Sequence, residues 1–203
     1  LGWSTSAGAV LVPRANAALS RKHPTITVTS REGGTPALVK ALRAGTVDLA
    51  ELATAPPFRP FDAESPALRV MTLVERSLRV AVPSTHPLAA RAAVTQEDLL
   101  GQRWIAGTGA HELGVWPGLA ERPSTAHTAR DWLAKLSLVA AGAGITTVPA
   151  TFTAAVPPGV RVLQVVDSTE QRRVVLARLP GPVPGPVDAL VQVFHAVAAD
   201  LTE

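Results

Sequence analysis

Two groups of small polar residues lie early in the chain, each between an apolar stretch and a helical pattern. The first group is Ser4, Thr5 and Ser6, and the second contains Gly34 and Thr35. Backbone N–H groups at the start of a helix, with hydroxyl groups beside them, bind anionic groups such as carboxylates. When two such turns end neighbouring strands of a parallel sheet, they face the same crevice. The spacing therefore predicts a binding site for a small molecule with an anionic group.

Helix capping is the alternative interpretation of these residues, because Ser and Thr before a helix usually cap it and Gly usually makes the turn. Capping explains any one of them taken alone. Because two separate groups are expected to line one crevice, ligand binding is favoured over capping.

A third loop of small residues has the same chemistry as the first two. It consists of Gly107, Thr108 and Gly109 and directly follows a predicted strand at residues 103–106. We include this loop in the candidate ligand-binding set, together with Thr128.

Two arginines and one glutamate are candidates for contacting charged groups of the ligand. Arg130 comes just before a helical pattern and is the favoured cation for an anionic ligand. Arg31 is the alternative, although a surface ion pair is the usual role of such an arginine. Glu51 is expected at the end of the third strand, where an acid allows a ligand with an amine. Which of the three contacts the ligand stays open.

Composition limits the classes of protein that fit. The 203 residues are 47% hydrophobic and 17% charged, enough for one large core or two small ones. The net charge is only +3 and the basic residues are scattered, which argues against nucleic-acid contact by this chain itself. With no cysteine there is no disulfide or thiolate metal site, and the five histidines lack metal-ligand spacing. No metal or cofactor is therefore expected.

Catalytic and membrane-spanning motifs are missing from the sequence as well. The chain contains no GxSxG, HExxH or P-loop motif and no cysteine nucleophile, so we expect no enzyme. The longest weakly polar stretch, residues 136–160, is broken by Gly and Pro and cannot cross a bilayer as one helix.

Apolar periodicity predicts strands alternating with helices, which is typical of an α/β fold. Strands are expected at residues 1–3, 26–30, around 47–49, and at 77–82, 103–106, 145–148, 160–166 and 173–179. Helices are expected from the first polar turn to residue 23, from residue 35 to residue 45, and at residues 131–141 and 187–201. A further short helix is expected after residue 95, and the side chains of Thr35 and Thr95 are each expected to cap the helix that they begin. Residues 55–66 hold several prolines and are expected to form a loop.

The helix expected at residues 131–141 carries several apolar residues. We expect Trp132, Leu133 and Leu136 to share its buried face. Trp104 and Trp132 are accordingly expected in the core rather than against a ligand.

Four segments carry a resemblance to a known family. In order along the chain they are LVPRANAALSRKHPTITVTSREGGTPALVKALRAGTVDLAE, LRVAVPSTHPLA, EDLLGQRWI and LSLVAAGAGITTVP. Their order and spacing resemble the effector-binding domain of LysR-type transcriptional regulators over nearly the whole chain. Members of that family have a winged helix-turn-helix before this domain. The resemblance implies that the chain is the regulatory part and contacts DNA only through an N-terminal domain missing here.

The resemblance also implies a fold similar to type 2 periplasmic binding proteins. This α/β fold has two Rossmann-like subdomains joined by two crossover strands, here near Ser77 and Asp167. Residues 1–77 and 168–203 would form the first subdomain and residues 78–167 the second, with the ligand between them. Ser6 and Thr35 match positions that touch the effector in relatives, and the effector would change the angle between the subdomains.

By the same resemblance, the expected partners are a small-molecule effector and a second copy of the chain. The copies would form a head-to-tail homodimer, and a tetramer in the full-length protein, in the cytoplasm. The contact residues would be Val10, Leu11 and Ala18 of one copy against Val139 and Ala143 of the other. A periplasmic solute-binding protein is the alternative, and an enzyme on the same fold is less favoured.

Overall fold

The chain forms two compact units, each described here by itself. The computed structural model describes residues 1–54, 67–75, 77–108, 114–121, 123–166 and 168–202. Unit 1 consists of Leu1–Ser77 and Gln171–Glu203, and unit 2 is the continuous stretch Leu78–Glu170. The loop expected at 55–66, the crossover residue Asp167 and the candidate Gly109 lie outside the described residues.

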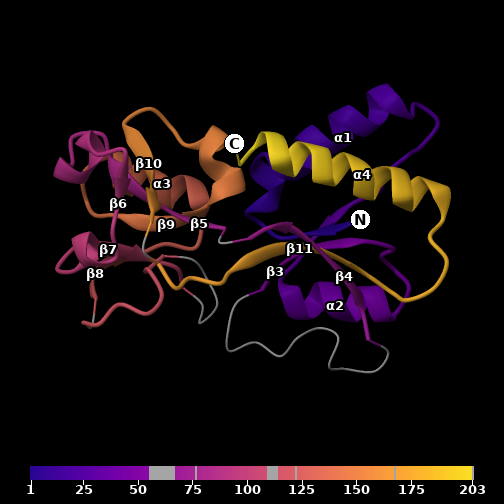
Figure 1. Ribbon diagram of the computed structural model, residues 1–203, viewed down its shortest axis with the longest axis horizontal. Helices are drawn as coiled ribbons and strands as arrows, with labels where there is room; N and C mark the ends of the chain where they lie inside the picture. The colour runs from indigo at the N-terminus through magenta and orange to yellow at the C-terminus, as the bar shows by residue number, and fades with distance from the viewer. Residues whose placement is uncertain (55–66, 76, 109–113, 122, 167, 203) are drawn as a thin grey trace. The chain divides into compact units, whose positions relative to one another are not determined.

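A five-stranded sheet organises unit 1 (Figure 1). The strand order is β2-β1-β3-β11-β4. Strand β1 pairs in parallel with β2 on one side and β3 on the other, and β11 runs antiparallel between β3 and β4. The strands are β1 (Gly2–Trp3), β2 (Arg31–Glu32), β3 (Ala50–Thr54), β4 (Arg69–Val74) and β11 (Arg173–Arg178).

Helices cover both faces of this sheet. A 3₁₀ turn, η1 (Ala7–Ala9), leads into α1 (Leu11–Lys22), which packs with α4 (Gly185–Asp200) on one face (Figure 1). The other face is covered by α2 (Thr35–Arg43). Alternate residues of β11 serve the two cores, because side chains along a strand point to opposite faces. Val174 and Leu176 pack with α1 and α4, and Val175 and Ala177 pack with α2.

Unit 2 contains a four-stranded sheet of order β6-β10-β5-β9 and a parallel pair, β7 and β8. In strand β5 (Leu78–Pro83), the side chains of Leu78, Val80 and Val82 pack in one core. The Ala81 side chain packs in another core, with Leu136 of helix α3 (Trp132–Ala140). Its elements are β5 (Leu78–Pro83), η2 (Pro87–Ala90), β6 (Ala93–Val94), η3 (Glu97–Leu99), β7 (Arg103–Ala106), β8 (Ser124–Thr128), α3 (Trp132–Ala140), β9 (Thr146–Pro149), η4 (Ala150–Ala155) and β10 (Val160–Val165).

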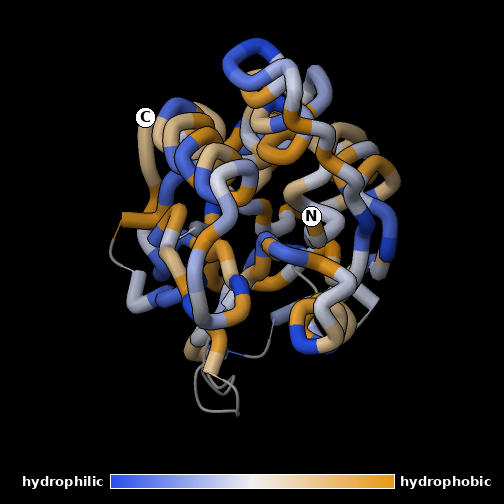
Figure 2. The backbone as a smooth tube through the Cα atoms, turned by 90° about the vertical axis from the view of Figure 1, so that its right-hand side faces the viewer, coloured by the Kyte–Doolittle hydropathy of each residue, from blue (hydrophilic) through white to orange (hydrophobic). Residues whose placement is uncertain are grey.

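Hydrophobic and hydrophilic positions alternate within the elements of both units (Figure 2). The last helix follows its predicted pattern, with Leu190, Val193, Phe194 and Val197 all buried. Trp104 is completely buried, as predicted. Among the helices that the described residues form, none is long and apolar enough to cross a membrane.

The second strand is shifted from its predicted position at 26–30 and comprises only Arg31 and Glu32. Ile26 and Val28 do pack against the core, which explains their alternation. The parallel register with β1 starts at Gly2 opposite Arg31, so residues 26–28 have no ladder partner in β1. The third strand also begins further along the sequence than predicted, at Ala50.

The predicted buried face of α3 is wrong at one position. Leu133 is 70% exposed, whereas Lys135 is only 2% exposed. The stripe that faces the core consists of the half-buried Trp132 and the buried Lys135, Leu136 and Val139, which is the helical spacing i, i+3, i+4, i+7. The Lys135 ammonium lies 4.6 Å from the centre of the Trp132 ring, so its apolar stem is buried along the helix.

Candidate functional site

The two polar turns of unit 1 lie side by side. Trp3 at the end of β1 is in register with Glu32 at the end of β2. The Gly33 N–H donates to the Trp3 carbonyl at 3.0 Å and holds the two chain segments together just beyond the paired residues. The turn at residues 4–6 and the turn at residues 33–35 therefore leave the same edge of the sheet as neighbours.

The first turn is tied to glutamates on both neighbouring strands. Ser4 donates twice to Glu51 Oε2 on β3, from its backbone N–H at 2.9 Å and from its hydroxyl at 2.7 Å. The hydroxyl oxygens of Ser4 and Ser6 lie 3.3 Å apart. On the other side, the Thr5 hydroxyl donates to Glu32 Oε1 on β2. The first turn is thus connected through side chains to both of its neighbours in the sheet.

Glu51 lies inside a strand and not at its end, which corrects the sequence-based placement. It is the second residue of β3, because that strand starts later than predicted, and it is 2% exposed. Burial raises the pKa of the Glu51 carboxyl, and the two hydrogen bonds from Ser4 and the charge of Arg172 oppose that rise. A carboxyl group therefore sits directly beneath the Ser4 turn.

The second turn does not use Thr35 as a cap, contrary to the prediction. Gly34 is the N-cap of α2, with the extended backbone angles φ −72° and ψ 156° that a cap position adopts. Thr35 is the first helical residue, and no side chain caps this helix start. The first N–H groups of a helix have no partner within the helix. Pro36 has no N–H, and the Leu38 N–H donates to the Gly34 carbonyl at 3.0 Å. The backbone donors at this helix start are therefore the N–H groups of Thr35 and Ala37, beside a Thr35 hydroxyl that capping does not use.

Capping does not explain Ser6 either. Ser6 is the residue before η1 and makes no side-chain cap hydrogen bond. Its backbone angles, φ −70° and ψ −31°, are helical and not those of a typical cap. Capping therefore accounts for neither the Ser6 nor the Thr35 hydroxyl.

Unit 2 repeats the arrangement of two parallel strands that end in small residues. Ala106 at the end of β7 is in register with Thr128 at the end of β8. Gly107 and Thr108 follow the first strand, and Arg130 follows the second, so these candidates come together within unit 2. Thr108, Thr128 and Arg130 are exposed.

The strand β8 was missed by sequence reasoning. All five of its residues, Ser124 to Thr128, are exposed, so it has no alternating apolar pattern. Its two threonines, Thr125 and Thr128, were the available signal, because β-branched residues favour strands. The helix that follows was predicted correctly, and Asp131 caps it by accepting from the Ala134 N–H at 2.9 Å.

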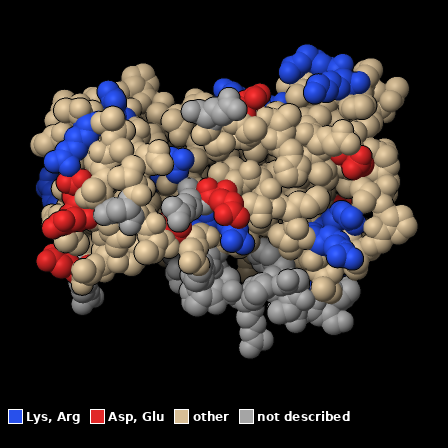
Figure 3. Space-filling view, in the orientation of Figure 1, with Lys and Arg blue, Asp and Glu red and all other residues tan. Residues whose placement is uncertain are grey.

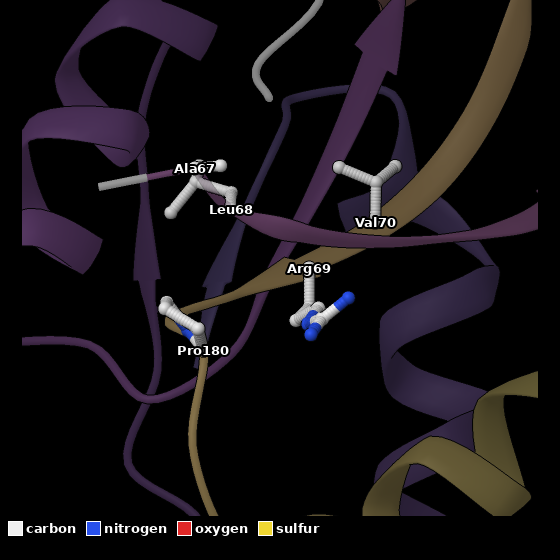
Figure 4. Close-up of a pocket in the computed structure, with 5 residues that line it drawn as sticks. All are labelled: Ala67, Leu68, Arg69, Val70 and Pro180. Atoms are coloured by element: carbon white, nitrogen blue, oxygen red, sulfur yellow. The ribbon is translucent and has the colours of Figure 1, made fainter. Parts of the chain in front are cut away.

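A hollow of about 450 Å³ lies elsewhere in unit 1 (Figure 4). It lies at β4, which is the opposite edge of the sheet from the two polar turns on β1 and β2. None of the predicted site residues that the structure describes lines it. The described lining residues are Ala67, Leu68, Arg69, Val70 and Pro180.

The described part of the chain contains no cluster of side chains suited to hold a metal ion. Within that part, no three His, Cys, Asp or Glu side chains gather to hold a metal ion. On the face shown in Figure 3, the Lys and Arg side chains form separate small groups among neutral surface.

Comparison with known proteins identifies the family. The model of the LysR substrate binding domain matches residues 1–199. The chain is 30% identical over 105 residues to the uncharacterized HTH-type transcriptional regulator YybE of Bacillus subtilis, covering 52% of the chain and 34% of that protein. It is 28% identical over 149 residues to the HTH-type transcriptional regulator BenM of Acinetobacter baylyi, covering 69% of the chain and 47% of that protein. The matches thus span less than half of each relative.

Solved structures confirm the α/β fold class. The effector binding domain of BenM with its effector benzoate superimposes with a TM-score of 0.78 at 22% identity, covering 100% of this chain and 93% of that one. The effector binding domain of QuiR in complex with shikimate superimposes with a TM-score of 0.70 at 19% identity, covering 98% of this chain and 95% of that one. With its family model matched over residues 1–199, this chain belongs to the LysR substrate-binding domain family.

Proposed function

We propose that this chain is the effector-sensing domain of a LysR-type transcriptional regulator and binds a small anionic or zwitterionic metabolite. The observation that carries the proposal is the pair of polar turns at one edge of the unit 1 sheet, in a chain that the family model covers from residue 1 to 199. BenM and QuiR, which share the fold, are described with benzoate and with shikimate.

The effector would contact the first turn, Ser4 to Ser6, and the second turn, Gly34 and Thr35, with Glu51 beneath the first. The family resemblance favours further contacts from Gly107, Thr108, Gly109, Thr128 and Arg130. Sensing needs no covalent chemistry. It needs only that the effector binds one conformation of the domain more tightly than another, and that difference limits the response.

A regulator is favoured over a solute-binding protein of a transporter. Both curated relatives are named as HTH-type transcriptional regulators, and the family model is that of LysR proteins. An enzyme is not favoured, because a regulator's effector-binding domain is not a class of enzyme. In the full-length protein we propose that a separate helix-turn-helix contacts DNA and that the protein works in the cytoplasm. Full-length CbnR, which shares the fold, is described in complex with its target DNA.

We also propose that two copies pair head to tail and that the full-length protein is a tetramer. Of the expected contact residues, Val10, Leu11 and Val139 are buried within their own units, and Ala18 and Ala143 are half-buried. Ala18 and Ala143 are therefore the better candidates for the contact. Sedimentation of this chain as a monomer alone, up to high concentration, would contradict the pairing.

The binding site is tested by removing one hydroxyl at a time. A thermal-shift screen of small acids, amino acids and aromatics first supplies a ligand, and calorimetry then measures its affinity for Ser6→Ala and Thr35→Ala. Each change should weaken binding about twofold to tenfold, the effect of one lost hydrogen bond. The melting temperature should hardly change, because neither hydroxyl caps a helix.

Ser20→Ala is the matched control, since Ser20 is exposed on α1 and far along the chain from both turns. The Ser20→Ala variant should bind the ligand with the same affinity as the wild type. Unchanged affinity in both Ser6→Ala and Thr35→Ala would refute the proposed site.

A further inference from the structure

The three hydroxyl groups of the first turn all direct their protons away from a ligand. A hydroxyl has one proton to donate and two lone pairs that accept. The Ser4 proton goes to Glu51 Oε2 at 2.7 Å, and the Thr5 proton goes to Glu32 Oε1. Because the Ser4 proton is already committed, Ser6 must be the donor across its 3.3 Å contact with Ser4. What the turn offers to a ligand is therefore oxygen lone pairs.

Some backbone donors of this turn and of η1 are also used. The Ser4 N–H donates to Glu51, and the N–H groups of Ala7 and Gly8 donate to the Ser4 carbonyl at 2.9 and 3.3 Å. Such groups would otherwise bind an anion at the start of a helix. The N–H groups of Thr5 and Ser6 donate to no acceptor among the described residues, whereas the three hydroxyl groups form a surface that accepts hydrogen bonds.

Negative charge reinforces this acceptor character. The Glu32 carboxylate is exposed beside Thr5, and Glu51 is buried beneath Ser4. Taking a carboxylate out of water is unfavourable unless it is hydrogen-bonded or paired with positive charge. A cation at the Ser4 turn would meet hydroxyl lone pairs first and two carboxyl groups behind them.

The neighbouring turn has the opposite character. At the start of α2 no side chain caps the helix, and the Thr35 hydroxyl is free of a capping role. The positive end of the α2 dipole favours a negative group there. A surface that accepts hydrogen bonds and a surface that donates them thus lie side by side.

We propose that the effector carries a protonated amine next to a carboxylate, as an α-amino acid does. The amine is held by the hydroxyl oxygens of Ser4, Thr5 and Ser6, with Glu32 and Glu51 as its counter-charges, and the carboxylate is held at the start of α2. Glu51 is the residue that determines this specificity. The inference rests on the proposed function, since it names the chemical class of that effector.

Matched triplets of small molecules test the inference on the whole 203-residue chain. Each triplet contains an α-amino acid, its deaminated acid and its decarboxylated amine, for example L-phenylalanine, 3-phenylpropanoate and phenethylamine, with further triplets built on small, acidic and branched side chains. Calorimetry and thermal shift report binding. In at least one triplet the amino acid should bind about tenfold or more tightly than its deaminated acid, the effect of a charge-assisted hydrogen bond.

Glu51→Gln assigns that preference to the carboxyl group. Gln keeps the size of the side chain and an oxygen that can accept from Ser4, but it removes the charge. The variant should bind the amino acid about tenfold more weakly and the deaminated acid no more weakly than the wild type does. Glu32→Gln, at an exposed position, is a second variant expected to act in the same direction. Glu97→Gln, exposed on η3 in unit 2, is the control that should change neither affinity.

The outcomes separate the inference from the function on which it rests. Deaminated acids that bind as tightly as their amino acids overturn the inference and leave the sensor function standing. An equal loss of both ligands in Glu51→Gln also overturns it, because the glutamate would then only support the turn. If no member of any triplet binds, both the inference and the proposed function are contradicted.

Discussion

Glu51 is the residue that most changes the chemistry of the candidate site. The sequence predicts two turns that donate hydrogen bonds to an anion, and it places an acid near them. In the structure that acid takes the donors of one turn, because Glu51 on β3 lies beside Ser4 at the end of β1. The two residues are 47 positions apart, so only the pairing of β1 with β3 brings them together.

The buried carboxyl of Glu51 should make stability depend on pH. Burial raises its pKa in the folded chain above the ordinary value of 4.5, so the folded chain binds this proton more tightly than the unfolded chain does. The contribution of Glu51 to stability is therefore least favourable at neutral pH and improves as pH falls through the raised pKa. It stops improving once pH is below the ordinary value.

Glu51→Gln removes this dependence and is expected to be more stable than the wild type at pH 7. The free energy of unfolding, measured in urea between pH 8 and pH 4.5, should show the gap between the two proteins closing as pH falls. A gap that widens toward acid pH would show that the carboxylate stabilises the fold.

At the scale of elements, the sequence predicts the helices well and the strands less evenly. Helix α4 and strands β5, β7, β9, β10 and β11 come within two residues of their predicted ranges, because their apolar residues have clear periods. Strands β4, β6 and β8 were missed, and β6 consists of only two residues, Ala93 and Val94. β8 is exposed along its whole length, and β4 is an edge strand in which five of the six residues are exposed or half-buried, so pairing rather than burial defines these two strands.

The same limit applies to the candidate site. Residue types before two helices were enough to locate both turns, since strand ends and helix starts follow from local pattern. Which way their hydroxyl protons point could not be predicted. That direction is set by Glu32 and Glu51, which reach the first turn from two other strands.

Two leucines on α3 test which face of that helix is buried. Leu136 is 2% exposed and packs with Ala81, Val148 and Phe152, whereas Leu133 is 70% exposed. Leu136→Ala should lower the free energy of unfolding by about 2–5 kcal/mol. Leu133→Ala, the matched control, should change it by no more than about 0.5 kcal/mol. Similar losses from both substitutions in urea unfolding would contradict this packing.

At the scale of the whole molecule, the chain consists of one discontinuous unit and one continuous unit inserted into it. The backbone passes between them at Ser77 to Leu78 and again at Glu170 to Gln171. Each unit has its own cores and its own pair of parallel strands that end in small residues.

The central claim is that the effector binds at the polar turns of unit 1. A crystal structure of the chain with the tightest-binding member of the triplets tests it most directly. We predict ligand atoms within about 3.2 Å of the Ser6 and Thr35 hydroxyls. A ligand that touches neither turn, or one that sits in the hollow beside Arg69, would contradict the claim.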